Sequence, residues 1–448
     1  MRVVFNGNKA VINLWGKQKI NRSATYRLMR YVLQVSHNRE TILHNVVTGE
    51  MVALNQEEQA LLNQMPSSYS FEMNSLIGRH FLVPEDYDEH KQVVGLRSVF
   101  RKMRPTETQP IRMVTILPTT ACNARCYYCF EHGIKTVTMT EKIADDVVKY
   151  IDSHCAGDRR VHITWFGGEP TVASERIDQI CEGLRRVGIK YQCNMITNGY
   201  LFDEEMICQA VSNWCLKDVQ ITIDGTEEKY NRVKAFVNAD SNPYNRVMRN
   251  RGLLLEKGVH VVIRMNFDVD NYTEFDSLLR EAKEKFHNNP QLQVVAFPVM
   301  GECTHRGSGE HQVDAGWFEE TIVELNDLSR NSGTKKIKTE LPCLNFNGCS
   351  ADNLSSIVID PEGMLLRCLE CVGHDQTIGN IYEGITDYEL AFLWDQVSDI
   401  PECVECPLFP SCLKVEKCPD KDSCLFKRER IHEFELAIKH HLGLANKV

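Results

Sequence analysis

The sequence predicts an α/β fold in which a series of βαβ units lies between a small mixed N-terminal segment and a cysteine-rich C-terminal segment. Three observations support this prediction. Six short apolar or β-branched runs alternate with helical stretches, this alternation stops after about residue 310, and nine of the 18 cysteines fall between residues 343 and 424. A chain of 448 residues is long enough for about three domains, and the limits that we expect are 1–105, 106–310 and 311–448.

The first segment, residues 1–105, is expected to form a small α+β domain. Thr41–Leu54 contains two short strand patterns around the turn pair Thr48-Gly49. Asn55 and Glu58 then form a capping-box pattern at the start of an amphipathic helix. The segment carries 14 Lys+Arg and 9 Asp+Glu, a net charge of +5 within a chain of net charge −10. The polar stretch 101–110, which contains two prolines, is expected to link this domain to the next.

The second segment alternates predicted strands with predicted helices, which indicates parallel βαβ units. The pattern fits either an open doubly wound sheet or a partly closed barrel. In both architectures, ligands bind at the carboxyl ends of the strands. The predicted strands are Ile111–Leu117, Val161–Trp165, Tyr191–Ile196, Val219–Ile223, Val259–Met265 and Leu292–Val299, and the helices are 141–154, 174–187, 203–213, 245–257 and 272–286.

The composition excludes several classes of protein. Hydrophobic residues make up 43% of the chain and charged residues 25%, as in ordinary globular proteins. The acidic balance argues against general nucleic-acid binding, and no apolar run reaches the ~18 residues of a membrane span. Since Met1–Trp15 also lacks a signal-peptide pattern, we expect a cytoplasmic protein with neither nucleic-acid nor membrane partners. In a reducing compartment, 18 cysteines indicate metal binding or catalysis rather than disulfides.

Three cysteines follow the first predicted strand within eight residues: Cys122, Cys126 and Cys129. Their thiolates are suited to wrap a compact metal centre. A four-iron cluster usually takes four cysteines, so three would leave one iron open to a substrate or cofactor. A structural zinc site without an evident fourth ligand, or a chance cluster, is the alternative interpretation.

This CxxxCx(aromatic)C pattern after the first strand resembles the radical S-adenosylmethionine (SAM) enzyme family. The resemblance implies a partial (β/α)6 barrel core and a 4Fe-4S cluster on the three cysteines. It further implies that SAM binds the open iron, that an electron from the cluster cleaves it, and that the resulting 5′-deoxyadenosyl radical abstracts hydrogen from a substrate. The aromatic residue before the third cysteine, Tyr128, would lie near the adenine.

Other strand ends carry groups that the resemblance assigns to SAM. Gly167, Gly168, Glu169 and Pro170 follow the second strand and resemble the GGEP motif, whose backbone and glutamate meet the amino group of SAM; a simple turn is the alternative. Thr222 is the expected ribose contact, and Arg264 is expected to hold the carboxylate of SAM. The remaining SAM-binding candidates are Thr197, Asn198 and Asp224. For Asn198 and Asp224, the alternative is a role in helix capping or in a turn.

The cysteine-rich tail resembles the SPASM extension of radical SAM peptide-modifying enzymes, which holds two auxiliary 4Fe-4S clusters. By analogy one cluster takes Cys343, Cys349, Cys368 and Cys418, and the other takes Cys403, Cys406, Cys412 and Cys424. The spacing after Cys412 is x5 instead of x3, so the assignments of Cys418 and Cys424 are the weakest. Cys371 is a ligand in place of Cys418, a redox-active thiol, or an inert neighbour. Zinc knuckles are the alternative for the whole tail.

The resemblance implies a radical SAM oxidoreductase that matures a ribosomal peptide. The preferred reaction is a cross-link, above all a Cys thioether; the alternatives are carbon–carbon or other cross-links, epimerisation, and formylglycine formation in sulfatases. Sulfatase-maturing members have an aspartate directly after the cysteine equivalent to Cys368, where this chain has Leu369, followed by Glu370. The N-terminal segment loosely resembles leader-recognition domains, with a scaffold role as the alternative. The expected partners are a precursor peptide with a leader and a flavodoxin- or ferredoxin-type electron donor.

Overall fold

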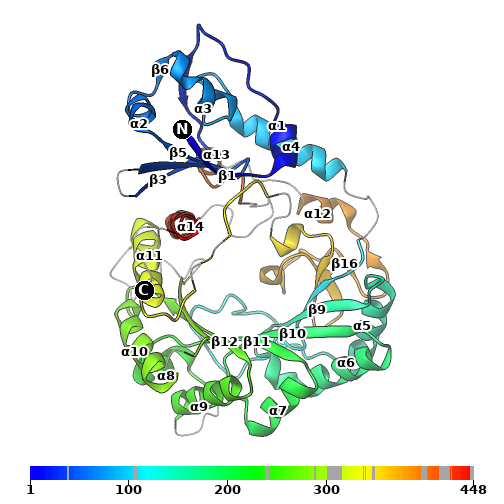
Figure 1. Ribbon diagram of the computed structural model, residues 1–448. Helices are drawn as coiled ribbons and strands as arrows, with labels where there is room; N and C mark the ends of the chain where they lie inside the picture. The colour runs from blue at the N-terminus through cyan, green and yellow to red at the C-terminus, as the bar shows by residue number, and fades with distance from the viewer. Residues whose placement is uncertain are drawn as a thin grey trace.

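Six parallel strands form the centre of the molecule in the computed structural model (Figure 1). They pair in chain order, as the sequence predicts, and their ends lie within a few residues of the predicted ones. The strands are β8 (Met113–Ile116), β9 (Arg160–Trp165), β10 (Lys190–Thr197), β11 (Leu216–Thr222), β12 (His260–Phe267) and β13 (Leu292–Pro298). The structure describes residues 1–37, 40–103, 109–237, 242–286, 289–299, 315–336, 338, 340–345, 349–394, 401–412, 424 and 426–443.

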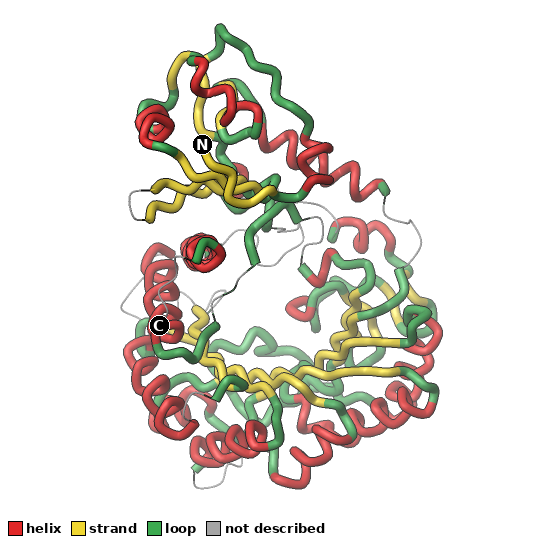
Figure 2. The backbone as a smooth tube through the Cα atoms, viewed as in Figure 1, coloured by secondary structure: helices red, strands yellow, loops and turns green. Residues whose placement is uncertain are grey.

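The sheet curves, and its connecting helices cover the outer, convex face (Figures 1 and 2). This arrangement confirms the α/β fold and the predicted partial barrel. Along β12, buried residues alternate with partly buried ones, and the buried set packs with the helices in one core. The helices are α5 (Glu141–His154), α6 (Ser174–Arg186), α7 (Glu204–Ser212), α8 (Glu227–Lys234), α9 (Pro243–Glu256) and α10 (Phe275–Phe286), with η2 (Pro170–Ala173) and η3 (Tyr272–Glu274) before α6 and α10.

Five of these helices lie where the sequence predicts them, and α8 is an addition. The side chains of Thr140 and Asp203 cap α5 and α7 by accepting hydrogen bonds from backbone N–H groups of the first turn. Helix α8 has eight residues, most of them polar, so it lacks the apolar periodicity on which the prediction of the other helices rests.

The N-terminal segment forms two small antiparallel sheets with short helices, which agrees with the α+β prediction. The capping box at Asn55 and Glu58 is present, and both of its hydrogen bonds form. One sheet has the order β1 (Arg2–Asn6), β5 (Glu50–Leu54), β4 (Glu40–Asn45), β3 (Val32–His37), and the other has β6 (Ser67–Ser68), β2 (Thr25–Leu28), β7 (Leu82–Pro84). The helices are α1 (Lys9–Trp15), α2 (Gln56–Leu62), η1 (Phe71–Met73), α3 (Asn74–Gly78) and α4 (Glu89–Lys102), the last of which extends into the predicted linker.

The C-terminal segment joins the central sheet. Strand β14 (Ser356–Ile359) pairs in parallel with β8 and forms an antiparallel hairpin with β15 (Met364–Leu366). Helix α11 (Ala315–Asn331) packs against β13, and α14 (Lys427–His441) packs against α11. The other elements are η5 (Ser350–Asp352), η6 (Leu369–Cys371), β16 (Gly379–Asn380), β17 (Gly384–Ile385), α12 (Tyr388–Leu393) and α13 (Pro401–Val404). The predicted boundary at residue 310 lies outside the described residues.

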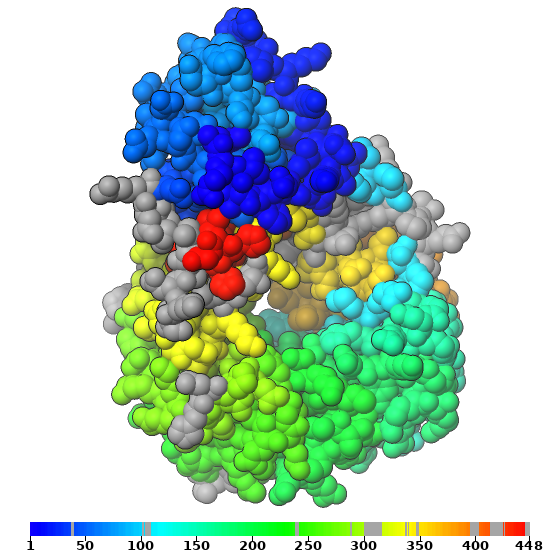
Figure 3. Space-filling model, in the orientation of Figure 1, coloured from blue at the N-terminus to red at the C-terminus, as the bar shows by residue number. Residues whose placement is uncertain are grey.

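The N-terminal domain rests on the C-terminal segment. Phe409 belongs to the N-terminal hydrophobic core, and the guanidinium of Arg97 lies 4.7 Å from the centre of its ring. Arg97 also donates hydrogen bonds to the backbone carbonyls of Phe409, Pro410 and Cys412 at 2.7–2.9 Å. Figure 3 shows the blue N-terminal domain at one end of the molecule, with the red C-terminal helix directly beneath it. The chain's two ends are thus tied together through the tail.

Candidate active site

The loop that follows β8 carries the three clustered cysteines. All three are partly buried. Burial raises the pKa of the Cys122 thiol to about 12 and that of Cys129 to about 11, and it also raises the pKa of Cys126. The charges of the neighbouring cysteines raise the pKa of Cys122 and Cys129 further, so the three thiols lie within electrostatic reach of one another. A cationic group that binds thiolates would relieve both effects, so the chemistry of this loop fits a metal cluster.

Hydrogen bonds to the end of β10 and to the end of α8 fasten this loop. The Asn198 amide, just after β10, donates from Nδ2 to Oδ1 of Asn123 at 2.7 Å. The backbone carbonyl of Asn123 accepts from the N–H of Val237, and that of Lys234 accepts from the N–H of Arg125, both at 2.8 Å. The cysteine loop is therefore held by β10 and by the end of α8 as well as by its own strand.

Gly167 and Gly168 bring the next strand end against the base of the cysteine loop. A Cβ atom on Gly168 would lie 2.5 Å from the carbonyl oxygens of Thr120 and Ala121, and one on Gly167 would lie 2.2 Å from that of Thr119. From the sequence, the backbone at these glycines is expected to meet a ligand, the amino group of SAM. In the structure they let two stretches of the chain's own backbone approach each other.

Glu169 is 1% exposed, and protein donors occupy both of its oxygens. Oε1 accepts hydrogen bonds from the Thr171 backbone at 3.1 Å and from the Thr197 hydroxyl at 2.7 Å, while Oε2 accepts from the Asn198 backbone at 2.7 Å. Burial raises the pKa of Glu169, and these donors oppose that rise. The carboxylate ties the end of β9 to the end of β10. Pro170, buried beside it, starts η2.

Tyr128 and Asp224 meet in a buried network that includes a residue no motif indicates, Lys234. The Tyr128 hydroxyl donates to Asp224 at 2.9 Å, and the Lys234 Nζ lies 3.0 Å from both Asp224 Oδ2 and Tyr128 Oη. Asp224 is fully buried and Lys234 is 2% exposed. A lone lysine at the end of an unpredicted helix carries no sequence pattern, so only the tertiary contacts could reveal it.

Arg264 lies on β12, opposite Thr222 of β11. Its Nε donates to the side-chain oxygen of Asn266 at 2.8 Å, and its guanidinium lies 3.5 Å from the centre of the Phe297 ring. Burial lowers the pKa of Arg264 to about 10, while the charges of Tyr128, Asp224 and Glu370 oppose that fall. The predicted carboxylate-binding arginine thus lies within electrostatic reach of Tyr128 and Asp224, two other predicted SAM contacts.

Among the tail cysteines, burial raises the pKa of Cys406, and the charges of Cys412 and Cys424 raise it further. The thiols of Cys412 and Cys424 therefore lie within electrostatic reach of the Cys406 thiol. Arg430 donates to the sulfur of Cys412 at 3.1 Å. The assignment of these three cysteines to one cluster stays a prediction.

In the other predicted set, the thiol of Cys368 hydrogen-bonds to that of Cys371, which raises its pKa. Cys343 and Cys349, of the same set, are exposed. Cys403, of the set that contains Cys406, packs beside the N-terminal core. Cys418 lies outside the described residues.

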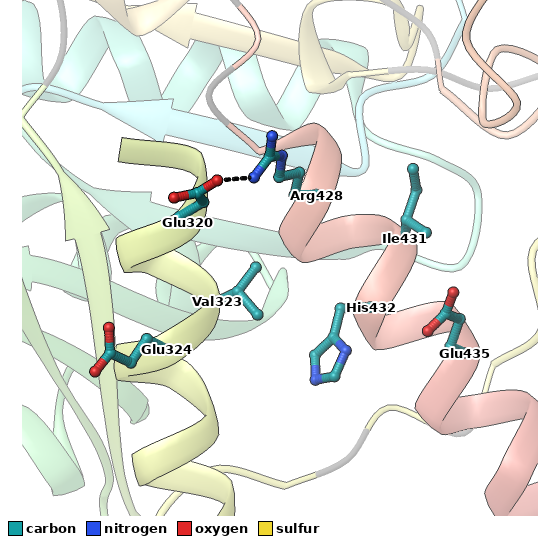
Figure 4. Close-up of a pocket in the computed structure, with 7 residues that line it drawn as sticks. All are labelled: Glu320, Val323, Glu324, Arg428, Ile431, His432 and Glu435. Carbon is teal, nitrogen blue, oxygen red and sulfur yellow. Dashed lines mark hydrogen bonds and ion pairs between the residues drawn. The ribbon is translucent and has the colours of Figure 1, made fainter. Parts of the chain in front are cut away.

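Two cavities lie away from these strand ends. One, of about 410 Å³, is formed by α11 and α14, where Arg428 pairs with Glu320 (Figure 4). The other, of about 590 Å³, lies in the N-terminal domain beside α1 and α3. Within the described part of the chain, no three His, Cys, Asp or Glu side chains form a site for a single metal ion. No helix in that part is long and apolar enough to cross a membrane.

A known family model matches the central part of the chain. Residues 116–282, which run from β8 into α10, match the model of the radical SAM superfamily. This stretch is a radical SAM domain. The superfamily implies a 4Fe-4S cluster and SAM, and the cysteine loop is chemically suited to the cluster.

Curated relatives share modest identity with this chain over most of its length. The radical SAM cyclopropyl synthase TigE of Paramaledivibacter caminithermalis is 20% identical over 73% of this chain and 71% of that protein. GTP 3′,8-cyclase of Clostridium perfringens is 21% identical over 64% of this chain and 90% of that protein.

Solved structures share the fold. The structure of anSMEcpe with bound AdoMet superposes with a TM-score of 0.57 at 20% identity, over 75% of this chain and 99% of that one. The structure of Streptococcus suis SuiB bound to precursor peptide SuiA gives a TM-score of 0.52 at 15% identity, over 88% and 94% of the two chains.

Proposed function

We propose that this radical SAM enzyme installs a cross-link, with a Cys thioether as the preferred product, in a ribosomally made peptide. The observation that carries the proposal is the cysteine loop, in which three neighbouring, partly buried thiols are fastened at the carboxyl edge of a parallel sheet. Bound there, the 4Fe-4S cluster and SAM would supply a radical that takes a hydrogen atom from the substrate. Cys122, Cys126 and Cys129 would hold the cluster.

The chain's own residues would orient SAM at this edge. Tyr128 would lie along the adenine, Thr222 and Asp224 would contact the ribose, and Arg264 would hold the carboxylate with its buried guanidinium. The GGEP stretch would meet the amino group, and Thr197 and Asn198 would contact the ribose or the carboxylate of SAM. Since the oxygens of Glu169 already accept bonds from threonine hydroxyls and backbone N–H groups, an ammonium group would use its remaining acceptor capacity.

The tail would hold two auxiliary clusters of the SPASM type. The grouping of Cys406, Cys412 and Cys424 supports one of them. The contact between the thiols of Cys368 and Cys371 supports Cys371 as a ligand or redox partner of the other. Strand β14 joins this region to β8, the strand that leads into the cysteine loop, so the tail would place its clusters on the same side of the molecule as the substrate.

A peptide substrate is supported by the fold relatives. The anSMEcpe structures include complexes with AdoMet and a peptide, and SuiB is known with its precursor peptide. The N-terminal domain would bind the leader by strand addition, since β1 and β3 are the edge strands of its larger sheet. A flavodoxin- or ferredoxin-type protein would deliver the electron.

Carbon–carbon bond formation is the second candidate, and the similarity to the cyclopropyl synthase TigE favours it. Both candidates remove hydrogen from the peptide, but only a thioether consumes a cysteine thiol. The two are therefore separated by alkylating the product with a thiol reagent before mass spectrometry.

The test is anaerobic reconstitution with iron and sulfide, followed by reduction with dithionite in the presence of SAM and the candidate precursor peptide. We expect release of 5′-deoxyadenosine and loss of two hydrogens from the peptide for each cross-link. Replacement of Cys122, Cys126 and Cys129 by alanine should abolish both products, whereas Cys208→Ala, at an exposed cysteine on α7, should leave them unchanged. Unchanged 5′-deoxyadenosine release by the triple variant would refute the proposal.

A further inference from the structure

Lys234 is a buried charge that none of the sequence motifs explains. It ends α8 and is 2% exposed. Its Nζ lies 3.0 Å from Asp224 Oδ2 and donates to the Tyr128 hydroxyl at 3.0 Å. Burying an ion pair costs solvation that its attraction only about repays, so such a pair is weak support for stability alone. Its location next to the cysteine loop gives it another use.

Lys234 is mechanically coupled to the cysteine loop. Its backbone carbonyl accepts the N–H of Arg125, a residue between the first two cysteines, at 2.8 Å. The chain leaves α8 through Ala235, whose φ of 42° lies in the left-handed region, and Val237 then bonds to Asn123. The ammonium and the loop backbone are therefore held in one arrangement.

The ammonium also acts on the cysteines through its charge. The Tyr128 hydroxyl, which Lys234 contacts, lies within hydrogen-bonding reach of the Cys126 thiol. Tyr128 also directly precedes Cys129, so the ammonium that contacts its hydroxyl lies close to two of the three cysteine ligands. Burial leaves this field little screened by salt.

We propose that Lys234 is a positioning residue that raises the reduction potential of the cluster held by Cys122, Cys126 and Cys129. This inference rests on the proposed function. Reduction adds one electron, supplied by a low-potential donor, and so one negative charge to the cluster. A fixed ammonium beside two of the three ligands stabilises the reduced form more than the oxidised form, since cluster potentials depend on nearby charge.

The test is a potentiometric titration of the reconstituted full chain, following the EPR signal that changes when SAM is added. We expect Lys234→Met to make reduction about tenfold less favourable, a shift of about −59 mV for one electron. Asp224→Asn, which leaves the ammonium without its counter-charge, should shift the potential upward. Lys234→Arg should remain near the wild type. Lys335→Met is the matched control, because Lys335 is also ion-paired, with Glu429 at 2.8 Å, but between α11 and α14.

Opposite signs for the two charge-removing variants support the inference, because a merely structural role predicts no such reversal. Shifts in the same direction, or no shift in either, overturn it. If Lys234→Met fails to fold, the double variant with Asp224→Asn leaves no unpaired charge, and its potential should fall between the expected values of the two single variants; a value outside that interval also overturns the inference. If the wild-type protein takes up no SAM-responsive cluster, the proposed function itself is refuted. If the cluster is normal but the variants leave its potential unchanged, only the inference about Lys234 is refuted.

Discussion

Asn198 holds the cysteine loop against the end of β10, so its replacement by alanine should loosen that loop. The side chain is 9% exposed. Its Nδ2 donates to Asn123 at 2.7 Å, and its Oδ1 accepts from the backbone N–H of Tyr200 at 3.0 Å. The alanine variant removes both bonds and leaves the Tyr200 N–H buried without its partner.

The expected cost follows from these two bonds. Each hydrogen bond contributes about 1 kcal/mol, and a buried N–H left without a partner costs about 1–3 kcal/mol more. Asn123 is only partly buried, so water can replace the bond lost there. We therefore expect a local destabilisation of about 2 kcal/mol, which corresponds to an increase of roughly 30-fold in the opening equilibrium of the loop.

Hydrogen–deuterium exchange of peptides that cover residues 119–129 measures this opening. Asn198→Asp keeps an acceptor for Tyr200 but places a carboxylate oxygen against Asn123, so it tests the loop bond alone and should also speed exchange. Asn289→Ala, which removes a comparable turn bond to Gln291 at 2.9 Å after α10, is the control. If loop exchange in Asn198→Ala stays within about twofold of the wild type, the proposed fastening is wrong.

Three further outcomes are expected. Gly168→Ala places a methyl group 2.5 Å from two carbonyl oxygens, so it should lower the free energy of unfolding by about 1–3 kcal/mol and also lower iron uptake. Gly157→Ala, where nothing lies within 4 Å of the added methyl group, should change neither quantity. Equal iron uptake by the two variants would contradict this account. Burial lowers the pKa of His44 to about 4 in the folded protein, so His44 of the unfolded chain takes up a proton first as the pH falls below 6.5. The free energy of unfolding, measured by denaturant titration, should therefore fall by about 2 kcal/mol between pH 7 and pH 5. His44→Gln should abolish this fall. Cys371→Ala should lower the iron content of the reconstituted protein if Cys371 is a cluster ligand, and an iron count equal to that of Cys208→Ala would exclude that role.

Local sequence patterns were sufficient for the central sheet. The alternation along β12 and the caps of α5 and α7 act over a few residues, so the strands and helices that they specify could be predicted closely. Helix α8 was missed because its eight residues are mostly polar and its stability depends on what it packs against. The pairing of β14 with β8 joins residues more than 200 positions apart, and no local pattern encodes such a partner.

The candidate site divides in the same way. The cysteine spacing and the strand-end motifs were by themselves sufficient to predict the radical SAM domain, because the identity of the residues and their separation along the chain are written in the sequence. Only the tertiary structure decided that Gly168 packs against backbone, that Glu169 binds protein donors, and that Lys234 lies beside Tyr128 and Asp224. Hydrogen bonds and close charge–charge contacts need atoms within a few ångströms of one another. Residues far apart in the chain reach such distances only when the chain has folded.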